Sequence, residues 1–166
     1  MNATEINIIV KVGMADLKVA DHPCILTTLG LGSCVGVALY DTKTKISGLA
    51  HVMLPSSLQA RNRSNIAKFA DTAIVCLVEE MITKGANKNS IIAKLAGGAQ
   101  MFTLNEMSDI MKIGARNVAA AKEILENLKI PIVAEDTGGN YGRTIELYSE
   151  DGRLFIKTIG YGVKNI

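Results

Sequence analysis

The chain has 166 residues, of which 48% are hydrophobic and 20% are charged, and its formal net charge is +2. This length and composition are typical of a globular protein, so we expect a single domain over residues 1–166. The eighteen Lys and Arg residues are scattered along the sequence, which argues against a nucleic-acid partner. No apolar run approaches the ~20 residues of a membrane-spanning helix, and no secretory signal is visible. We therefore expect a cytoplasmic protein that does not insert into membranes.

Four strands are expected in the N-terminal third of the chain. They are predicted over residues 6–12, 25–29, 35–40 and 45–53, where β-branched and apolar residues are concentrated. The last two flank the polar group Asp41-Thr42-Lys43-Thr44, which suits the loop of a β-hairpin. If Tyr40 and Lys45 close that loop, the antiparallel register of both strands is determined. Cys34 is then predicted to lie directly opposite His51.

The rest of the chain combines two helices with further strands. Apolar residues recur at helical spacing from Ile66 to Met81, with Asn65 or Ser64 suited to cap the start and Gly85 to end the helix. A second helix is predicted over 116–128, and strands over 91–95, 130–135, 144–148 and 154–159. About eight strands with two main helices indicate an α+β protein with a layered sandwich architecture.

Cys34 and His51 are the candidate catalytic pair. A free thiol has a pKa of about 8.5, so activity near neutral pH requires a positive neighbour such as a protonated His51. We therefore expect a thiolate and imidazolium pair, with the sulfur as nucleophile. Gly32 and Ser33 lead into Cys34 in a glycine-rich loop whose main-chain amides are predicted to form an oxyanion hole. Thr28, at the end of the preceding strand, is predicted to orient the imidazole ring.

Other interpretations of the same residues are open. A lone Cys beside a lone His is more often a packing pair than a catalytic one. Cys76 is expected to pack at the edge of a helix's apolar face, and Cys24 is expected to cap a strand without a chemical role. The three cysteines lack CxxC spacing, which argues against a disulfide scaffold and a zinc site. The thiol of Cys34 also suits a redox sensor, but no second cysteine is close in sequence. The segment Gly30–Val35 lacks the third glycine and the following helix of a dinucleotide-binding fingerprint, so no nucleotide cofactor is expected.

Five short motifs are spread over nearly the whole chain. They are Thr28-Leu-Gly-Leu-Gly-Ser-Cys34, His51-Val-Met-Leu-Pro55, Ala96-Gly-Gly-Ala99, Ile113-Gly-Ala-Arg-Asn117 and Ala134-Glu-Asp-Thr-Gly-Gly-Asn140. In combination, though not singly, they resemble the chemoreceptor glutamine deamidase family, CheD. One departure from the family pattern is Phe69, where a tyrosine is expected.

The resemblance implies a protein-glutamine amidohydrolase that converts chosen glutamines of chemotaxis receptors to glutamates and releases ammonia. It also implies a layered α/β/β sandwich, similar to the catalytic domains of deamidating toxins. The family's cysteine, histidine and threonine correspond to Cys34, His51 and Thr28, and no cofactor or metal is expected. A phosphatase of the CheC type is the implied partner, and Phe102 is the predicted residue at that contact. The alternative function is a non-catalytic chemotaxis adaptor that regulates this phosphatase.

Overall fold

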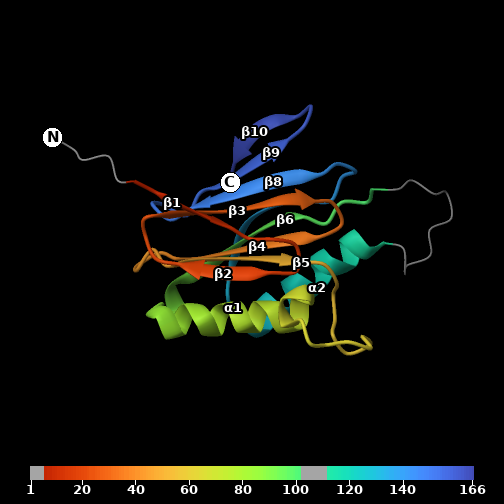
Figure 1. The fold of residues 1–166 in the computed structure, drawn as a ribbon, viewed down its shortest axis with the longest axis horizontal. Helices are drawn as coiled ribbons and strands as arrows, with labels where there is room; N and C mark the ends of the chain where they lie inside the picture. Colours follow the sequence, from red (N-terminus) through yellow and green to blue (C-terminus); the bar gives the residue numbers. More distant parts are fainter. Residues whose placement is uncertain (1–5, 102–111) are drawn as a thin grey trace.

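Two mixed β-sheets form the body of the molecule (Figure 1). The computed structural model describes residues 6–101 and 112–166, and these contain ten strands. The first sheet has the order β1 (Ile8–Lys11), β3 (Cys24–Leu31), β8 (Arg143–Tyr148), β9 (Leu154–Thr158) and β10 (Gly162–Asn165). The second has the order β2 (Leu17–Ala20), β5 (Ser47–Val52), β4 (Val35–Asp41), β6 (Ile91–Gly97) and β7 (Ile132–Thr137). Pairing is antiparallel except for β1 with β3 and β6 with β7, which are parallel.

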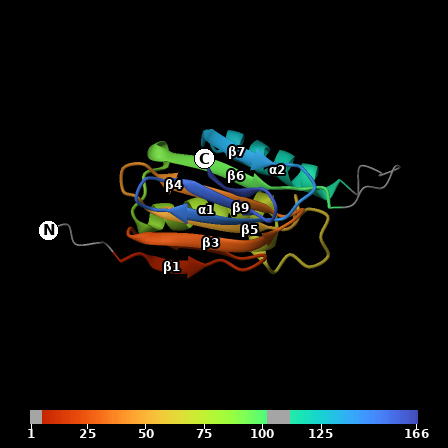
Figure 2. The same cartoon turned by 90° about the horizontal axis from the view of Figure 1, so that it is seen from above.

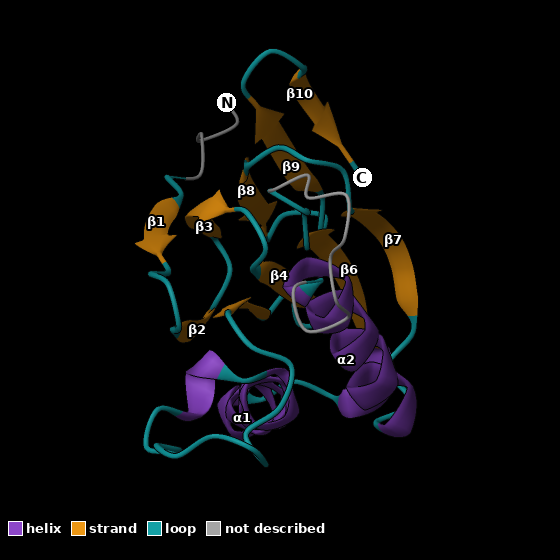
Figure 3. Cartoon of the chain, turned by 90° about the vertical axis from the view of Figure 1, so that its right-hand side faces the viewer, coloured by secondary structure: helices purple, strands orange, loops and turns teal. Residues whose placement is uncertain are grey.

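Two helices cover the outer face of the second sheet. They are α1 (Ala70–Lys84) and α2 (Ile113–Asn127), and short 3-10 helices at Ile66–Lys68 and Lys88–Ser90 precede α1 and β6. Figure 3 shows both helices on the same side of the strands, and Figure 2 shows strands of the first sheet lying over β4 and β5. This α/β/β layering confirms the predicted fold class. Within the described segments, no helix is both long and apolar enough to cross a lipid bilayer.

The central strands of the second sheet are buried on both faces. Every residue of β4 and β5 is buried, which explains why these strands read as unbroken apolar runs instead of alternating ones. On the helix side, Val37 packs in one core with Leu77 of α1. On the other side, Leu49 packs in a second core with Leu26 and Ile145 of the first sheet. This second core, between the two sheets, is called the inter-sheet core below, and it contains the candidate site.

Two of the ten described strands were not expected from the sequence. Strands β2 and β10 have four residues each, and all four residues of β10 are exposed. Such short strands at the edge of a sheet have too little hydrophobic periodicity to be recognised, because pairing with a neighbour creates them.

The first helix begins later than its apolar spacing suggests. Asn65 caps the 3-10 helix rather than α1, because its side chain accepts a hydrogen bond from the amide of Ala67 at 3.1 Å. The α-helix then runs from Ala70 to Lys84. The helix ends where the sequence predicts. Gly85 adopts a left-handed conformation with φ of 119°, and its amide donates hydrogen bonds to main-chain carbonyls in the last turn of the helix.

The predicted hairpin forms, but its register differs from the expected one by two residues. Tyr40 pairs with Ser47 rather than Lys45, because the four-residue loop begins one residue later: the amide of Asp41 donates to the carbonyl of Ile46, and Lys45 lies within the loop with a left-handed φ of 62°. The buried carboxylate of Asp41 holds this loop by accepting hydrogen bonds from the amides of Lys43 and Asn87. Burial alone would raise the pKa of Asp41, but these bonds and one from a serine hydroxyl lower it to about 2. A shift by an even number of residues leaves every side chain on its predicted face.

Candidate active site

Thr28 and His51 meet across the inter-sheet core. Thr28 lies on β3 of the first sheet and His51 on β5 of the second, and they are 1% and 0% exposed. Oγ1 of Thr28 lies 2.7 Å from Nδ1 of His51 and 2.7 Å from the main-chain oxygen of Val12. A carbonyl oxygen only accepts, so the single hydroxyl proton of Thr28 goes to Val12 and the hydroxyl oxygen accepts from Nδ1. This arrangement holds His51 with its proton on Nδ1 and leaves the lone pair on Nε2.

The second ring nitrogen of His51 is available for proton transfer. Among the described residues, buried Nε2 has no hydrogen-bond partner. Burial also lowers the pKa of His51 below its ordinary value of 6.5. The imidazole is therefore neutral near pH 7, with a basic nitrogen that is not occupied by any described residue.

Cys34 lies on the same face of the second sheet as His51. It follows β3, directly precedes β4, and belongs to the inter-sheet core with 7% of its surface exposed. The strand residue opposite His51 is Gly36, where an added Cβ would lie 2.5 Å from Cδ1 of Ile145 in the first sheet. Cys34 lies two residues before Gly36 and just outside β4, so it is not the residue paired with His51. The expectation that Cys34 and His51 are directly opposed is therefore wrong, whereas the expectation of a shared face is confirmed.

Burial favours the neutral forms of both groups. Burial raises the pKa of the Cys34 thiol above its ordinary value, and a hydrogen bond from the residue's own main-chain amide only partly offsets this. Because the pKa of His51 moves downward, the resting state is a thiol beside a neutral imidazole. This differs from the thiolate and imidazolium pair expected from the sequence.

The same burial argues against the redox-sensor interpretation. A sensor needs a thiol of low pKa near a second cysteine, but burial raises the pKa of all three cysteine thiols. Cys24 begins β3 while Cys34 follows its end, and Cys76 lies on α1, beyond the second sheet. The three cysteines thus occupy three different parts of the fold.

The segment Gly30–Cys34, called the nucleophile loop below, is anchored to the end of β6. The amides of Ala99 and Gly98 donate to the carbonyls of Gly32 and Cys34, each at 2.8 Å. Close approach requires glycine at the neighbouring position 97, where φ is 105° and an added Cβ would lie 2.3 Å from the oxygen of Cys34. The motif Ala96-Gly-Gly-Ala99 therefore supports the loop that carries the candidate nucleophile.

The predicted oxyanion donors in this loop are not equivalent. The amide of Gly32 is used within the loop, where it donates to the carbonyl of Gly30 at 3.1 Å. The amide of Cys34 instead forms a hydrogen bond with the sulfur of its own side chain, which acts to lower the pKa of the thiol. The two glycines of the loop are required for different reasons. Gly30 adopts a left-handed φ of 69°, whereas Gly32 lies close to Met101, whose side chain would be 3.4 Å from an added Cβ.

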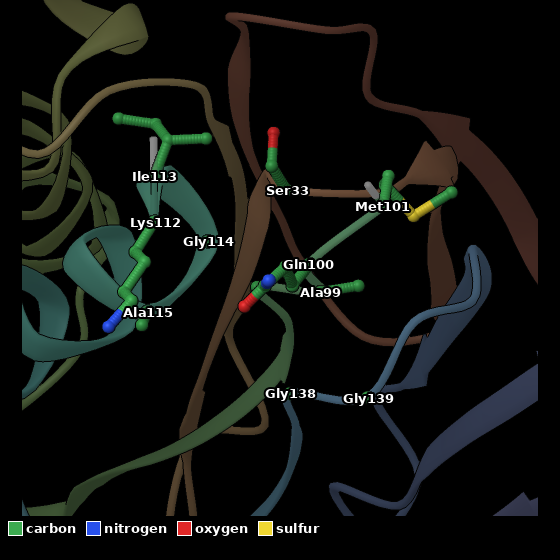
Figure 4. A pocket seen from close by; sticks show the side chains of 11 residues that line it. Ser33, Ala99, Gln100, Met101, Lys112, Ile113, Gly114, Ala115, Gly138 and Gly139 are labelled. Atoms are coloured by element: carbon green, nitrogen blue, oxygen red, sulfur yellow. The ribbon is translucent and has the colours of Figure 1, made fainter. Parts of the chain in front are cut away.

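A cavity of about 230 Å³ opens beside Ser33, the residue before Cys34. Figure 4 shows Lys112 and Ile113, at the start of α2, on one side of it and Gln100 and Met101 on the other. The turn at Gly138-Gly139 also lines the cavity. The predicted partner-binding residue Phe102 lies outside the described residues.

Two residues near this site were missed as functional candidates. Arg143 is buried, pairs with Asp136 at 3.2 Å and donates to the carbonyl of Gly138 at 2.9 Å, which supports the turn beside the cavity. Asn117 of α2 donates to the carbonyl of Ser33 at 3.0 Å. The sequence held one signal for both residues, which is a polar side chain at a position that the hydrophobic pattern predicts to be buried. Arg143 is in phase with the buried residues of β8, and Asn117 is in phase with those of α2.

Replacing Thr28 with valine tests the assignment of the His51 tautomer. The change leaves a buried Nδ1–H without an acceptor, so the free energy of unfolding should fall by about 1–3 kcal/mol in urea denaturation. In ¹⁵N NMR spectra the wild-type ring should be protonated on Nδ1, and this preference should weaken in the variant. Thr27→Val is the matched control, because the Thr27 hydroxyl donates to Ile145 instead of contacting His51. A wild-type ring that carries its proton on Nε2 would contradict the assignment.

The fold is similar to that of a solved structure of low sequence identity. Neisseria meningitidis protein NMB0706, of family DUF152, is 11% identical to this chain with a TM-score of 0.50. The similarity covers 81% of this chain and 65% of that one. At this identity the likeness concerns the fold alone.

Sequence relatives are much closer. The probable chemoreceptor glutamine deamidase CheD of Caldanaerobacter subterraneus subsp. tengcongensis is 65% identical over 158 residues, which is 95% of this chain and 98% of that relative. The protein of the same description from Lachnoclostridium phytofermentans is 54% identical over 157 residues, again 95% of this chain and 98% of the relative. The family model CheD, described as CheD chemotactic sensory transduction, matches residues 53–158. The chain therefore belongs to the CheD family, as its five motifs predicted.

Proposed function

We propose that this protein is a protein-glutamine deamidase that hydrolyses selected glutamine side chains of chemotaxis receptors to glutamate, with release of ammonia. Family membership and the names of the relatives support the reaction and the substrate class. The observation that carries the mechanism is the Thr28–His51 hydrogen bond, which leaves a basic Nε2 on the face of the sheet that also bears Cys34. The chain acts as a single deamidase domain without a cofactor.

The reaction begins from the neutral thiol and imidazole. As the sulfur of Cys34 attacks the carboxamide carbon, Nε2 of His51 accepts the thiol proton. The main-chain amide of Cys34 donates to the oxyanion that develops on the carboxamide oxygen. The imidazolium then protonates the leaving nitrogen, the C–N bond of the tetrahedral intermediate breaks, and ammonia departs, which leaves a thioester on Cys34. Water, deprotonated by the same imidazole, hydrolyses the thioester to glutamate and restores the thiol.

Two features of the resting site suit this sequence of steps. The Thr28 oxygen accepts from Nδ1–H throughout, so it stabilises the ring most when the imidazolium forms. Nε2 of His51 has no hydrogen-bond partner among the described residues, so it is not bonded to Cys34 in the resting site, and substrate binding brings the two groups within proton-transfer distance. Coupling proton transfer to attack avoids the need for a free thiolate in a buried site.

Loss of the sulfur tests the nucleophile. Cys34→Ala should lower kcat for a glutamine-containing receptor peptide by about a thousandfold or more, because no other group replaces the covalent step. Ammonia release and the mass change of amide to acid report the reaction. Cys76→Ala is the matched control and should retain full activity, since Cys76 lies on α1 outside the inter-sheet core. Ammonia release by Cys34→Ala at the wild-type rate would refute the mechanism.

The protonation state of His51 sets the acid limb of the pH profile. Burial lowers the pKa of His51, so kcat/KM should hold down to pH 6.5 and fall only at lower pH, as the base becomes protonated. The free energy of unfolding should also decrease below pH 6.5, because the unfolded chain then binds a proton that the buried ring does not. Steady-state kinetics and urea denaturation measure the two effects. An acid limb with its midpoint above 6.5 would point instead to an ion pair.

We further propose that the protein acts in the cytoplasm and is bound there by a CheC-type phosphatase. Three free cysteines, Cys24, Cys34 and Cys76, are consistent with a reducing compartment. The phosphatase is the partner that the resemblance to the CheD family implies. A purely non-catalytic adaptor, the alternative function, would bind the phosphatase but would show no ammonia release that depends on Cys34.

Binding and catalysis should be separable. The folded Cys34→Ala protein should bind a CheC-type phosphatase with an unchanged Kd in calorimetric titration, because the thiol is almost fully buried. Phe102→Ala should weaken that binding while leaving the Thr28–His51 pair intact. Loss of phosphatase binding in Cys34→Ala alone would contradict a separate binding role.

A further inference from the structure

Asn117 is a polar residue on the buried face of a helix. It is fully buried on α2, on the face that also buries Gly114, Ala121 and Leu125. An apolar side chain would suffice to pack this face against the sheet, and burial of an amide is unfavourable unless its hydrogen bonds are made. The hydrogen-bond partners of Asn117 therefore indicate why a polar residue occupies this buried position.

Both hydrogen bonds donated by the Asn117 side chain go to the open end of the β4–β5 hairpin. Nδ2 lies 3.0 Å from the carbonyl oxygen of Ser33 and 2.9 Å from that of Met53. Only the nitrogen of the amide can donate, so these two acceptors determine which way the amide faces. Ser33 precedes Cys34, and Met53 lies two residues after His51. One amide group thus connects the segment of the nucleophile to the strand of the base.

The bond to Ser33 also determines the direction of the Cys34 amide. The carbonyl of Ser33 and the N–H of Cys34 belong to one planar trans peptide unit and point in opposite directions. With the carbonyl held toward Asn117, the N–H is directed away from α2, and it forms a hydrogen bond with the sulfur of Cys34. This N–H is the oxyanion donor of the proposed reaction.

Ser33 differs from its neighbours in how its carbonyl is held. The carbonyls of Gly32 and Cys34 accept from main-chain amides, which a side-chain substitution does not remove. The carbonyl of Ser33 accepts from a side chain, that of Asn117. The orientation of the Ser33–Cys34 peptide therefore depends on one replaceable group.

We propose that Asn117 is a positioning residue for catalysis, which orients the Ser33–Cys34 peptide and holds Cys34 in place relative to His51. Its effect is transmitted through the main chain, and it does not touch the substrate. The inference rests on the proposed deamidase function, since it assigns a role within that reaction.

Asn117→Leu removes both donors at nearly constant volume. Compared with the wild type, the variant should have a kcat for the receptor peptide that is about 10- to 100-fold lower and a KM within about twofold. The reason is that the orientation of the oxyanion donor matters most in the transition state. The matched control is Leu125→Ala, which loosens the same buried face of α2 without contacting the nucleophile loop. The control should lose stability but keep the wild-type kcat of the folded protein.

A second measurement does not depend on deamidase activity. The rate at which iodoacetamide alkylates Cys34, followed by mass spectrometry across pH, reports the pKa of the thiol. Without its amide hydrogen bond, the Cys34 thiol of Asn117→Leu should have a higher pKa than that of wild type or Leu125→Ala. If wild type releases no ammonia, the proposed function fails, and this profile alone decides the role of Asn117.

An unchanged kcat or an unchanged alkylation profile in folded Asn117→Leu would overturn the proposal. Should that variant not fold, Asn117→Ser serves in its place, because a hydroxyl can donate to only one of the two carbonyls. It should show a smaller loss of kcat and a smaller rise of the thiol pKa, and wild-type values of both would again overturn the proposal.

Discussion

The candidate site depends on a hydrogen bond between the two sheets. Thr28 belongs to the first sheet and His51 to the second, and their contact at 2.7 Å exists only because the sheets pack face to face. Through the Thr28 hydroxyl, the main-chain carbonyl of Val12 determines which nitrogen of the imidazole ring carries the proton. Since that carbonyl takes the hydroxyl proton, the ring proton stays on Nδ1 and Nε2 is left as the base.

Burial explains the remaining chemistry of the pair. In a solvent-exposed site, an imidazolium beside a thiolate would be the expected resting state for a nucleophilic cysteine. Inside the inter-sheet core both charged forms lose hydration, and the pKa values of Cys34 and His51 move toward the neutral pair. In the proposed reaction, charge appears only during catalysis, when Thr28 would stabilise the imidazolium and the Cys34 amide would stabilise the oxyanion.

Much of the fold followed from local patterns. The apolar spacing of α1 and its end at Gly85 could be predicted, because helix periodicity and a left-handed glycine are properties of nearby residues. The register of the hairpin could not. It depends on the left-handed Lys45 and on the carboxylate of Asp41, which binds an amide 46 residues away in the sequence. Strand β10 was missed for the same reason, since pairing with β9 defines it.

The sequence by itself determined the α/β/β fold class, the family, and Thr28, Cys34 and His51 as candidates for the site. Residue chemistry and motif spacing are local, so they can be read without coordinates. Only the tertiary structure decided the direction of the pKa shifts of Cys34 and His51 and the contacts of Asn117, whose two acceptors are 84 and 64 residues away. Desolvation and hydrogen-bond partners arise from contacts between distant segments, and no local pattern in the chain encodes them.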